Sequence, residues 1–377
     1  MGHPPYTYDS LNRIVQANTV NTNSVNCWGD AFTIDAWGNL TNVNPPAGIA
    51  GGCATQSLSN PANVQNQLTS LTYDIAGNVI NDGAGNAPTY DAESTMATDA
   101  GVTYDYDADG VRTEKSSGTM YWPGPSGTLT ETDLTGTVNE EYIYFNGERI
   151  ARIDQPSGTV HYYFSNHLGS ASVITDPSGD IQEQMDYYPY GGISYSSGSD
   201  PNRYKFTGKE RDSESGLDNF GARYNASSVG RFMSPDAGED AGFDHMSDPQ
   251  SWNGYAYVRN NPTTLTDPDG NNYSVCDTNG QNCADLTNDQ YNQYLQSIQG
   301  TNTTVNSAGQ IQYTNDNGSV TNLGTASYYN EQDVAAARML VQTGVTLSDP
   351  RTIAGFYGAS FLLGGSKRLG KVPSAGN

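Results

Sequence analysis

The sequence predicts an all-β fold built of short hairpins, and three observations lead to that prediction. The composition favours strands and turns, with 42 glycines and 26 tyrosines among 377 residues. An aromatic-Asp pattern recurs along the first half of the chain, each time followed by a small turn. Asp109-Gly110 and Asn146-Gly147 supply the positive φ angles that two-residue hairpin turns need.

The recurring pattern is an alternating strand, an aromatic residue followed by Asp, a tight turn and a returning strand. Alternation places one aromatic side chain of each strand on a buried face. One hairpin cannot bury that face alone, so neighbouring hairpins are expected to stack into a continuous sheet. The copies begin at Tyr6, Phe32, Leu71, Tyr104, Tyr142 and His161.

The charge balance excludes some classes of partner. Lys and Arg total 17 against 41 Asp and Glu, which gives a formal net charge of −24 and argues against nucleic acid and anionic membrane surfaces. The most apolar stretch, residues 353–363, is about half the ~20 residues that a membrane-spanning helix needs, so no membrane span is expected. The first residues show no signal peptide, because they lack a basic start and an apolar run.

The four cysteines, at positions 27, 53, 276 and 283, lack a CxxC spacing, so no zinc or other metal site is expected. No phosphate-loop or dinucleotide-binding motif is present, and no cofactor is expected. Cys276 and Cys283 flank a turn and could face each other across a hairpin. A disulfide there and two separate buried thiols are both open interpretations.

A longer series of motifs follows the repeats. It runs from His167-Leu-Gly-Ser through Tyr187-Tyr-Pro-Tyr-Gly, Phe206-Thr-Gly-Lys-Glu-Arg-Asp and Gly230-Arg-Phe-Met-Ser-Pro-Asp to Thr266-Asp-Pro-Asp-Gly. Together with the repeats, this order of motifs over about residues 1–270 resembles the RHS or YD repeat family with its RHS repeat-associated core domain. Teneurins, bacterial polymorphic toxins and toxin-complex subunits are relatives. The resemblance implies stacked hairpins that form part of a spiral, barrel-like shell, closed by the core domain.

The resemblance also predicts the domain organisation: YD repeats over 1–160, the core domain over 161–270 and a small, mixed, variable C-terminal region over 271–377. In the last region we expect hairpins at 273–284 and 301–323 and helices at 289–299 and 331–343. Few repeat copies are present, so we expect the C-terminal end of a longer shell or a truncated relative. The implied partners are the remaining shell repeats or a companion shell subunit, and the C-terminal effector segment.

The sharpest chemical hypothesis concerns two aspartates. In related toxins, two Asp-Pro-x-Gly-type motifs supply a carboxylate pair that cuts the chain after the second motif. That motif is Asp267-Pro268-Asp269-Gly270 here, and Asp236 stands in the first position, followed by Ala237 and Gly238 rather than by Pro. The candidate catalytic pair is therefore Asp236 and Asp267, with Arg223 and Arg231 as candidate charge partners. Asp-Pro-x-Gly is also good turn chemistry, as in Asp176-Pro-Ser-Gly, so a purely structural role stays open.

Two other groups of residues have a structural interpretation. The charged run from Lys209 to Asp212 is expected to form an internal salt-bridge network that fixes the core domain. His161 and His167 are expected to be surface or core imidazoles.

The function that we predict is that of a shell protein, which scaffolds or encapsulates a C-terminal effector in a secreted or cell-surface system. The first alternative is an aspartic autoprotease that releases the C-terminal region after the motif at Asp267; no other enzymatic activity is expected. The second alternative is a surface adhesin that binds glycans through exposed tyrosines.

Overall fold

The computed structural model describes residues 6–19, 27–49, 52–145, 147–236 and 252–271, and the backbone of five strands between residues 273 and 325. The chain divides into two compact units, Met1–Asn272 and Tyr273–Asn377. Within the described residues the regular elements are β-strands and short 3-10 helices, which confirms the all-β fold class. No helix in this part of the chain is long and apolar enough to cross a membrane.

Antiparallel sheets make up the first unit, and within each sheet every strand pairs with its neighbour in the sequence. A five-stranded sheet comes first, with β1 (Tyr6–Tyr8), β2 (Ile14–Asn18), β3 (Gly29–Ile34), β4 (Leu40–Asn44) and β5 (Leu58–Ser59). The next hairpin pairs β6 (Thr72–Tyr73) with β7 (Val79–Asn81).

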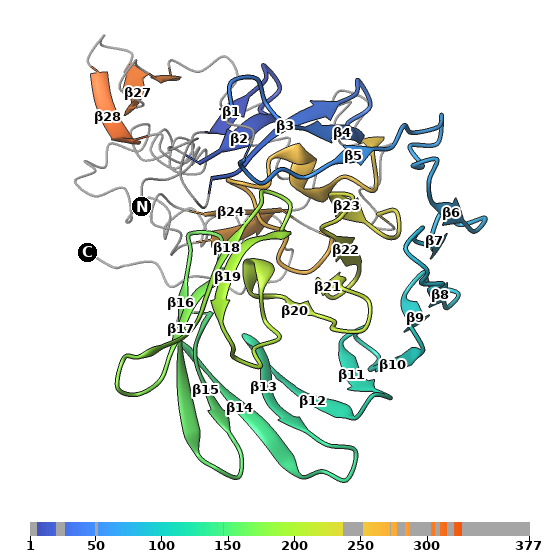
Figure 1. The fold of residues 1–377 in the computed structure, drawn as a ribbon, viewed down its shortest axis with the longest axis vertical. Coiled ribbons are helices and arrows are strands. Elements are labelled where there is room, and N and C mark those ends of the chain that lie inside the picture. Colours follow the sequence, from blue (N-terminus) through green and yellow to red (C-terminus); the bar gives the residue numbers. More distant parts are fainter. Residues whose placement is uncertain are drawn as a thin grey trace, which may run out of the picture. The chain divides into compact units, whose positions relative to one another are not determined.

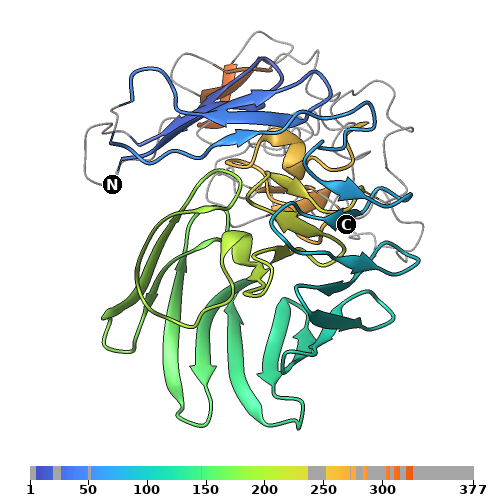
Figure 2. The same cartoon turned by 45° about the vertical axis from the view of Figure 1, so that its right-hand side comes forward.

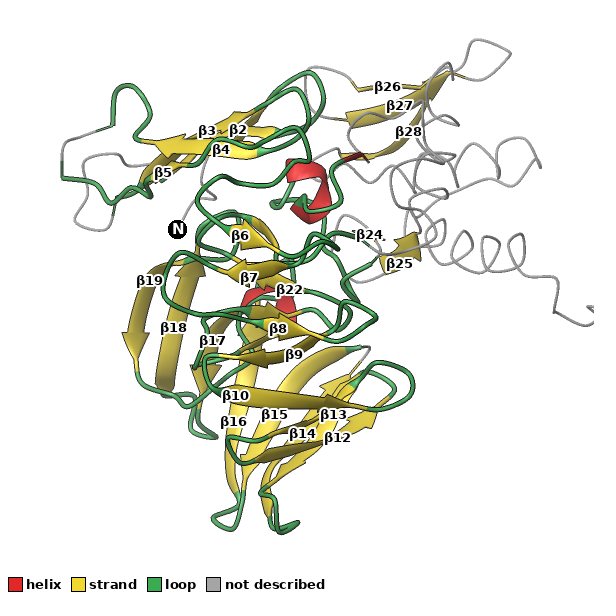
Figure 3. Cartoon of the chain, turned by 90° about the vertical axis from the view of Figure 1, so that its right-hand side faces the viewer, coloured by secondary structure: helices red, strands yellow, loops and turns green. Residues whose placement is uncertain are grey.

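The largest sheet among the described residues has 12 strands and runs from β8 to β19 in sequence order. Its strands are β8 (Thr89–Tyr90), β9 (Met96–Asp99), β10 (Val102–Tyr106), β11 (Arg112–Lys115), β12 (Thr119–Gly124), β13 (Gly127–Thr132), β14 (Val138–Phe145), β15 (Glu148–Asp154), β16 (Thr159–Ser165), β17 (Ala171–Thr175), β18 (Ile181–Tyr187) and β19 (Ile193–Gly198). Figure 3 shows β16–β19 side by side.

A four-stranded sheet lies in the core segment, residues 199–271. It contains β20 (Glu210–Arg211), β21 (Asp218–Asn219), β22 (Tyr224–Ala226) and β23 (Arg231–Phe232). The strands β6–β19 follow an arc, and β20–β23 lie on its concave side (Figures 1 and 2). The core segment therefore packs against the inner face of the repeats, and the sheets are not closed into a barrel.

The Asp of the repeat pattern caps the turn that follows it. In the turn after β10, the Oδ1 atom of Asp107 accepts hydrogen bonds from the backbone N–H groups of Asp109, at 2.9 Å, and Val111, at 3.0 Å. Gly110 has a φ of 77°, which a side-chain-free residue adopts without strain. The same bonds to the second and fourth following residues recur at Asp9, Asp35, Asn63, Asp91, Asp133, Asn166 and Asp176.

These capped turns give the hairpins a common register, because the residue before the cap pairs with the residue six positions later. Tyr106 pairs with Arg112, and a β-bulge precedes this pair. The equivalent pairs are Tyr8 with Ile14, Ile34 with Leu40, Tyr90 with Met96, Thr132 with Val138, Ser165 with Ala171 and Thr175 with Ile181. Bulges increase strand twist and bending, so each hairpin adds to the curvature of the sheet.

The prediction of a two-residue turn at Asp109-Gly110 is wrong. The N–H of Asp107 bonds to the carbonyl of Val111, which leaves three residues in the loop. The Asp107 side chain stabilises this longer turn, and only Gly110 takes the left-handed conformation. By contrast, Phe145 pairs with Glu148, so two residues separate β14 from β15 as predicted; Asn146 itself lies outside the described residues.

An aromatic cluster forms the centre of the core segment. Phe206, in the 3-10 helix η1 (Phe206–Gly208), packs against Tyr257, in η3 (Tyr257–Asn260), with ring centroids 5.8 Å apart. Phe220 and Phe232 pack on the same tyrosine ring at 5.5 and 5.8 Å. All four side chains are buried, and full burial of a ring of this size contributes about 2–3 kcal/mol.

Buried ion pairs fasten the core segment to the repeats, which confirms the predicted network for Glu210 and Asp212 but not for Lys209, which donates to the carbonyl of Pro268. Arg112 of β11 bonds to Glu210 and to Asp212, each at 2.7 Å, and Lys115 bonds to Asp212 at 3.0 Å. The Asp212 carboxylate is completely buried. The partners lie about 100 residues apart in the sequence, so this ion-pair latch joins segments that no local pattern connects.

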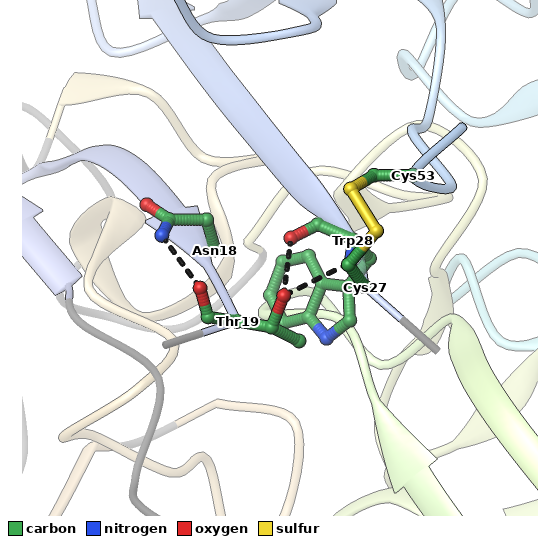
Figure 4. The surroundings of a disulfide bond; sticks show 5 residues. All are labelled: Asn18, Thr19, Cys27, Trp28 and Cys53. Carbon is green, nitrogen blue, oxygen red and sulfur yellow. Dashed lines mark hydrogen bonds between the residues drawn. A yellow bond between two sulfur atoms is a disulfide. The ribbon is translucent and has the colours of Figure 1, made fainter. Parts of the chain in front are cut away.

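A disulfide that the sequence did not predict joins Cys27 to Cys53 (Figure 4). The carbonyl of Cys27 accepts a hydrogen bond from the N–H of Ala54 at 2.9 Å, and the Thr19 hydroxyl accepts one from the N–H of Trp28 at 3.1 Å. The bond therefore holds the chain beyond Cys53 against the start of β3. The two cysteines are 26 positions apart and belong to no motif of closely spaced cysteines, so the sequence did not indicate that they pair.

The second unit contains two small antiparallel sheets among its described strands. The strand β24 (Tyr273–Cys276) pairs with β25 (Cys283–Leu286), with Cys276 opposite Cys283, as expected of the predicted hairpin. A three-stranded sheet contains β26 (Thr303–Val305), β27 (Gln310–Thr314) and β28 (Val320–Thr325). The predicted helices over 289–299 and 331–343 lie outside the described residues.

Candidate functional site

Asp267 caps the turn that follows it, with bonds to the second and third following residues rather than the second and fourth, and it is buried. Its Oδ1 atom accepts hydrogen bonds from the N–H groups of Asp269, at 3.2 Å, and Gly270, at 2.7 Å. The residue is 2% exposed, whereas Asp176 in the other Asp-Pro-x-Gly turn is only partly buried. The motif therefore forms a turn, as the structural interpretation expects. Its first carboxylate is also buried, and burial shifts the pKa of a carboxylate.

Arg223, which immediately precedes β22, brings the two predicted aspartates together. Its Nη2 atom lies 3.3 Å from Oδ2 of Asp236 and 3.6 Å from Oδ2 of Asp267. Its Nη1 atom donates to the carbonyl of Gly254 at 2.9 Å, which fixes the guanidinium. One cation therefore lies beside both carboxylates; the sequence had offered Arg223 as one of two candidate charge partners.

The environment raises the pKa of Asp267 to about 7, mainly because burial disfavours its charged form. The cation of Arg223 opposes this effect, and the neighbouring Asp269 adds to it. Near neutral pH, Asp267 therefore exchanges between its protonated and ionised forms. A carboxyl group that holds a proton at this pH can act as a general acid.

The backbone that follows Asp267 is held at each of its next three carbonyl groups. Lys209 Nζ donates to the carbonyl of Pro268, the N–H of Ala222 donates to that of Asp269 at 2.9 Å, and Arg223 Nε donates to that of Gly270. From the sequence, Lys209 is expected in the salt-bridge network, and Ala222 carries no recognisable role. Backbone N–H donors leave no signal in a sequence, so Ala222 could not have been found.

Two glycines make this close packing feasible. A Cβ on Gly221 would lie 2.9 Å from the carbonyl oxygen of Asp269, and Gly221 has a φ of +100°. A Cβ on Gly270 would lie 2.8 Å from the backbone nitrogen of Arg223. Any larger residue at either position would push the Asp267 turn away from the backbone around Arg223.

Arg231 does not join the site. Its guanidinium donates to the carbonyl of Asn66 at 2.7 Å and to Oδ1 of Asn39 at 2.8 Å. It also lies over the ring of Tyr255. Arg231 therefore fastens β23 to the first repeats, and the structure gives it a role in packing rather than in tuning the aspartates.

The histidines lie elsewhere and contact polar groups of the first unit. The two ring nitrogens of His161 lie 3.1 Å from Asp154 and 2.7 Å from Asp200. The Nε2 atom of His167 lies 3.0 Å from the carbonyl oxygen of Thr263. Both imidazoles are thus part of the contacts between the repeats and the core segment.

A cavity of about 850 Å³, which we call the lumen, lies between the repeat turns and the core segment. Turns of β8–β15 line one side, and Arg223, Pro268, Asp269 and Asn271 line the other. Arg223 and the turn that follows Asp267 are therefore part of the lumen wall. The chain that continues beyond Asn271 starts from this wall.

Comparisons with known proteins show which proteins part of this chain is similar to and which fold it shares. Residues 137–263 match the family model described as Teneurin YD-shell. The tRNA3(Ser)-specific nuclease WapA of Bacillus spizizenii is 33% identical over 261 residues, which are 63% of this chain and 11% of that protein. Toxin subunit YenC1 of Yersinia entomophaga is 26% identical over 332 residues, 70% of this chain and 33% of that protein. The chain thus spans a third or less of these two relatives.

Solved structures agree with this match. The crystal structure of TcdB2-TccC3-Cdc42 aligns with a TM-score of 0.56 and 23% identity, over 71% of this chain and 15% of that one. The Tc holotoxin pore of Photorhabdus luminescens aligns with the same TM-score. At this identity the alignment shows a common fold. Residues 137–263 therefore resemble the teneurin YD-shell, and the chain shares its fold with structures of toxin complexes.

Proposed function

We propose that this chain is a segment of a shell that encloses the polypeptide following Asn271. The observation that carries the proposal is the lumen, whose wall includes Asp269 and Asn271, close to the end of the first unit at Asn272. The curved repeats and the ion-pair latch would hold that wall rigid around the enclosed segment. The remaining shell repeats or a companion subunit would complete the enclosure.

Limited proteolysis of the full chain tests encapsulation. The second unit offers trypsin five sites, at Arg338, Arg351, Lys367, Arg368 and Lys371. An enclosed segment is cleaved much more slowly in the native chain than after unfolding in urea, as followed by intact mass. Equal cleavage rates in the two states would refute encapsulation by this chain alone.

A second candidate function, self-cleavage, is favoured by the two carboxylates at Arg223. In the reaction that we propose, Asp236 is the base and accepts a proton from water while the water oxygen bonds to the carbonyl carbon of Gly270. Protonated Asp267 then gives its proton to the nitrogen of Asn271 as the C–N bond breaks. Arg223 Nε, already bonded to the Gly270 carbonyl, would stabilise the developing negative charge on that oxygen.

Intact mass under denaturing conditions tests self-cleavage. A fragment that begins at or just after Asn271, absent from Asp236→Asn and Asp267→Asn, supports the carboxylate pair. Asp176→Asn is the matched control, because it alters an Asp-Pro-x-Gly turn outside the site and should leave cleavage unchanged. A single full-length mass for the unmodified chain would leave the motif at Asp267 as a structural turn.

We also propose that the protein acts outside the cytosol, in a secreted or cell-surface system. The Cys27–Cys53 disulfide supports this location, because such bonds persist mainly in oxidising compartments. Glycan binding through exposed tyrosines has less support. Tyr104, Tyr121 and Tyr142 of the repeats are buried, as core residues of a hairpin array would be.

A further inference from the structure

Lys209 lies at the Asp267 turn, and the self-cleavage reaction proposed above gives it no role. Its Nζ atom donates to the carbonyl of Pro268, the residue that directly follows Asp267. The same atom lies 5.5 Å from the ring centroid of Phe220, which favours a cation over its face. A cationic side chain therefore contacts the residue next to the candidate general acid.

The backbone that carries Lys209 is fixed on both sides. Its N–H donates to the carbonyl of Phe206 at 3.0 Å, and its carbonyl accepts a bond from the N–H of Lys205 at 2.8 Å. The next residue, Glu210, pairs with Arg112 at 2.7 Å in the ion-pair latch. The ammonium group of Lys209 thus extends from an anchored part of the core segment and is preorganised for its contact.

The contact with Lys209 fixes the turn at a residue that has few other ways of being held. Pro268 has no backbone N–H, so its carbonyl is the only hydrogen-bonding group of its backbone. The proposed reaction needs the Asp267 carboxyl and the Gly270 carbonyl at a fixed spacing. A displacement of about 1 Å can lower a rate about a hundredfold, so an anchor at Pro268 bears directly on the reaction.

We propose that Lys209 is a positioning residue for self-cleavage, which holds the Asp267 turn in place through the carbonyl of Pro268. Its role differs from that of Arg223, because Arg223 Nε bonds to the carbonyl at the bond to be cut, whereas Lys209 bonds two residues earlier. This inference rests on the proposed self-cleavage and adds to it a residue that acts through the turn.

The charge of Lys209 gives this role a signature in the pH dependence of cleavage. The other titratable or charged groups around the Asp267 carboxyl belong to Arg223, Asp236, Asp269 and Tyr257. The Lys209 cation lowers the pKa of Asp267, so its removal raises that pKa. A general acid must be protonated to act, and the alkaline limb of the pH profile should therefore move to higher pH.

Time courses of self-cleavage test the inference. The full chain is unfolded in urea, refolded by dilution at a series of pH values and followed by intact mass. Lys209→Met keeps much of the apolar stem and should slow cleavage about tenfold to a hundredfold, with the alkaline limb at higher pH. Lys209→Arg keeps a cation with N–H donors and should restore most of the rate and the original limb.

Lys205→Met is the matched control. It removes a neighbouring ammonium group that pairs with Glu183 at 3.3 Å, and it should leave both the rate and the pH profile unchanged. Circular dichroism shows that each variant is folded before the rates are compared.

The inference and the proposed self-cleavage can fail separately. If the original chain and Lys209→Met are cut at the same rate with the same pH profile, self-cleavage stands and the role of Lys209 is refuted. A lower rate with an unchanged pH profile, not restored in Lys209→Arg, would show a contribution to folding alone and would also refute it. If the original chain is not cut at any pH, self-cleavage fails and the role of Lys209 fails with it.

Discussion

Replacing Arg112 by methionine tests whether the ion-pair latch holds the core segment on the repeats. Methionine keeps much of the apolar stem of Arg112 and removes the charge. Asp212, completely buried, would keep only Lys115 as its cationic partner, and Glu210 would lose its bond at 2.7 Å. The change therefore leaves buried carboxylates without their main counter-charge.

The expected loss is large because burial controls the energy of an ion pair. Breaking a buried pair by removing one partner typically costs about 3–5 kcal/mol, whereas an exposed pair contributes about 1 kcal/mol or less. We therefore expect Arg112→Met to lower the free energy of unfolding by about 3–5 kcal/mol. Arg13→Met is the matched control, since Arg13 pairs with the more exposed Asp9 at 2.7 Å and should cost about 1 kcal/mol.

Urea unfolding followed by tyrosine and tryptophan fluorescence measures both losses. A double-mutant cycle with Asp212→Asn isolates the coupling, because the double variant should lose less than the sum of the single losses. A loss below about 1 kcal/mol for Arg112→Met would show that the latch does not stabilise the unit. Additive losses in the cycle would show that the two residues act independently.

Four further predictions follow from the turns, the site and the disulfide. Asp107→Ala should cost about 1 kcal/mol in urea unfolding, more than Asp107→Asn, which keeps one acceptor for the turn N–H groups. Burial raises the pKa of Asp267 from 3.8 to about 7, so ionising it destabilises the fold increasingly between pH 4 and 7 and fully above pH 7. The Tm of the original chain should therefore fall relative to Asp267→Asn across that range, and a constant difference would contradict the shift. Gly221→Ala should destabilise by about 1–3 kcal/mol, more than Gly216→Ala, whose Cβ would meet nothing within 4 Å. Replacing Cys27 and Cys53 together by serine should cost about 3–4 kcal/mol, the loop-closure value for cysteines 26 residues apart, and equal stability of the oxidised and serine forms would refute this.

The repeats could be predicted from the sequence because their turns depend on residues that are close together in the chain. Each capped turn depends on an Asp or Asn and a residue with positive φ three positions later, as with Asp107 and Gly110, so the pattern is visible within five letters. The pairing of Asp236 with Asp267 followed from the family motifs. The sequence does not distinguish the roles of Arg231 and Arg223. Only the fold shows that Arg231 bonds to Asn66 and not to the two aspartates.

Contacts between distant segments could not be predicted in the same way. The charged run at Glu210 and Asp212 indicated an ion network, but nothing in it identified Arg112 as the partner. The Cys27–Cys53 disulfide could not be predicted either, because it depends on how the first sheet brings two loops together. The number of loop residues at Asp109-Gly110 was also misjudged, because the Asp107 side chain competes with a tighter turn.

The strictly sequential order of the twelve-stranded sheet bears on how the protein folds. Hairpins whose partners are a few residues apart close rapidly, and each can add to the last as the chain leaves the ribosome. The ion-pair latch between Arg112 and Asp212 cannot form until about 100 further residues have been synthesised. The curved sheet is therefore expected to form early and to stay open on its concave side until the core segment has been synthesised.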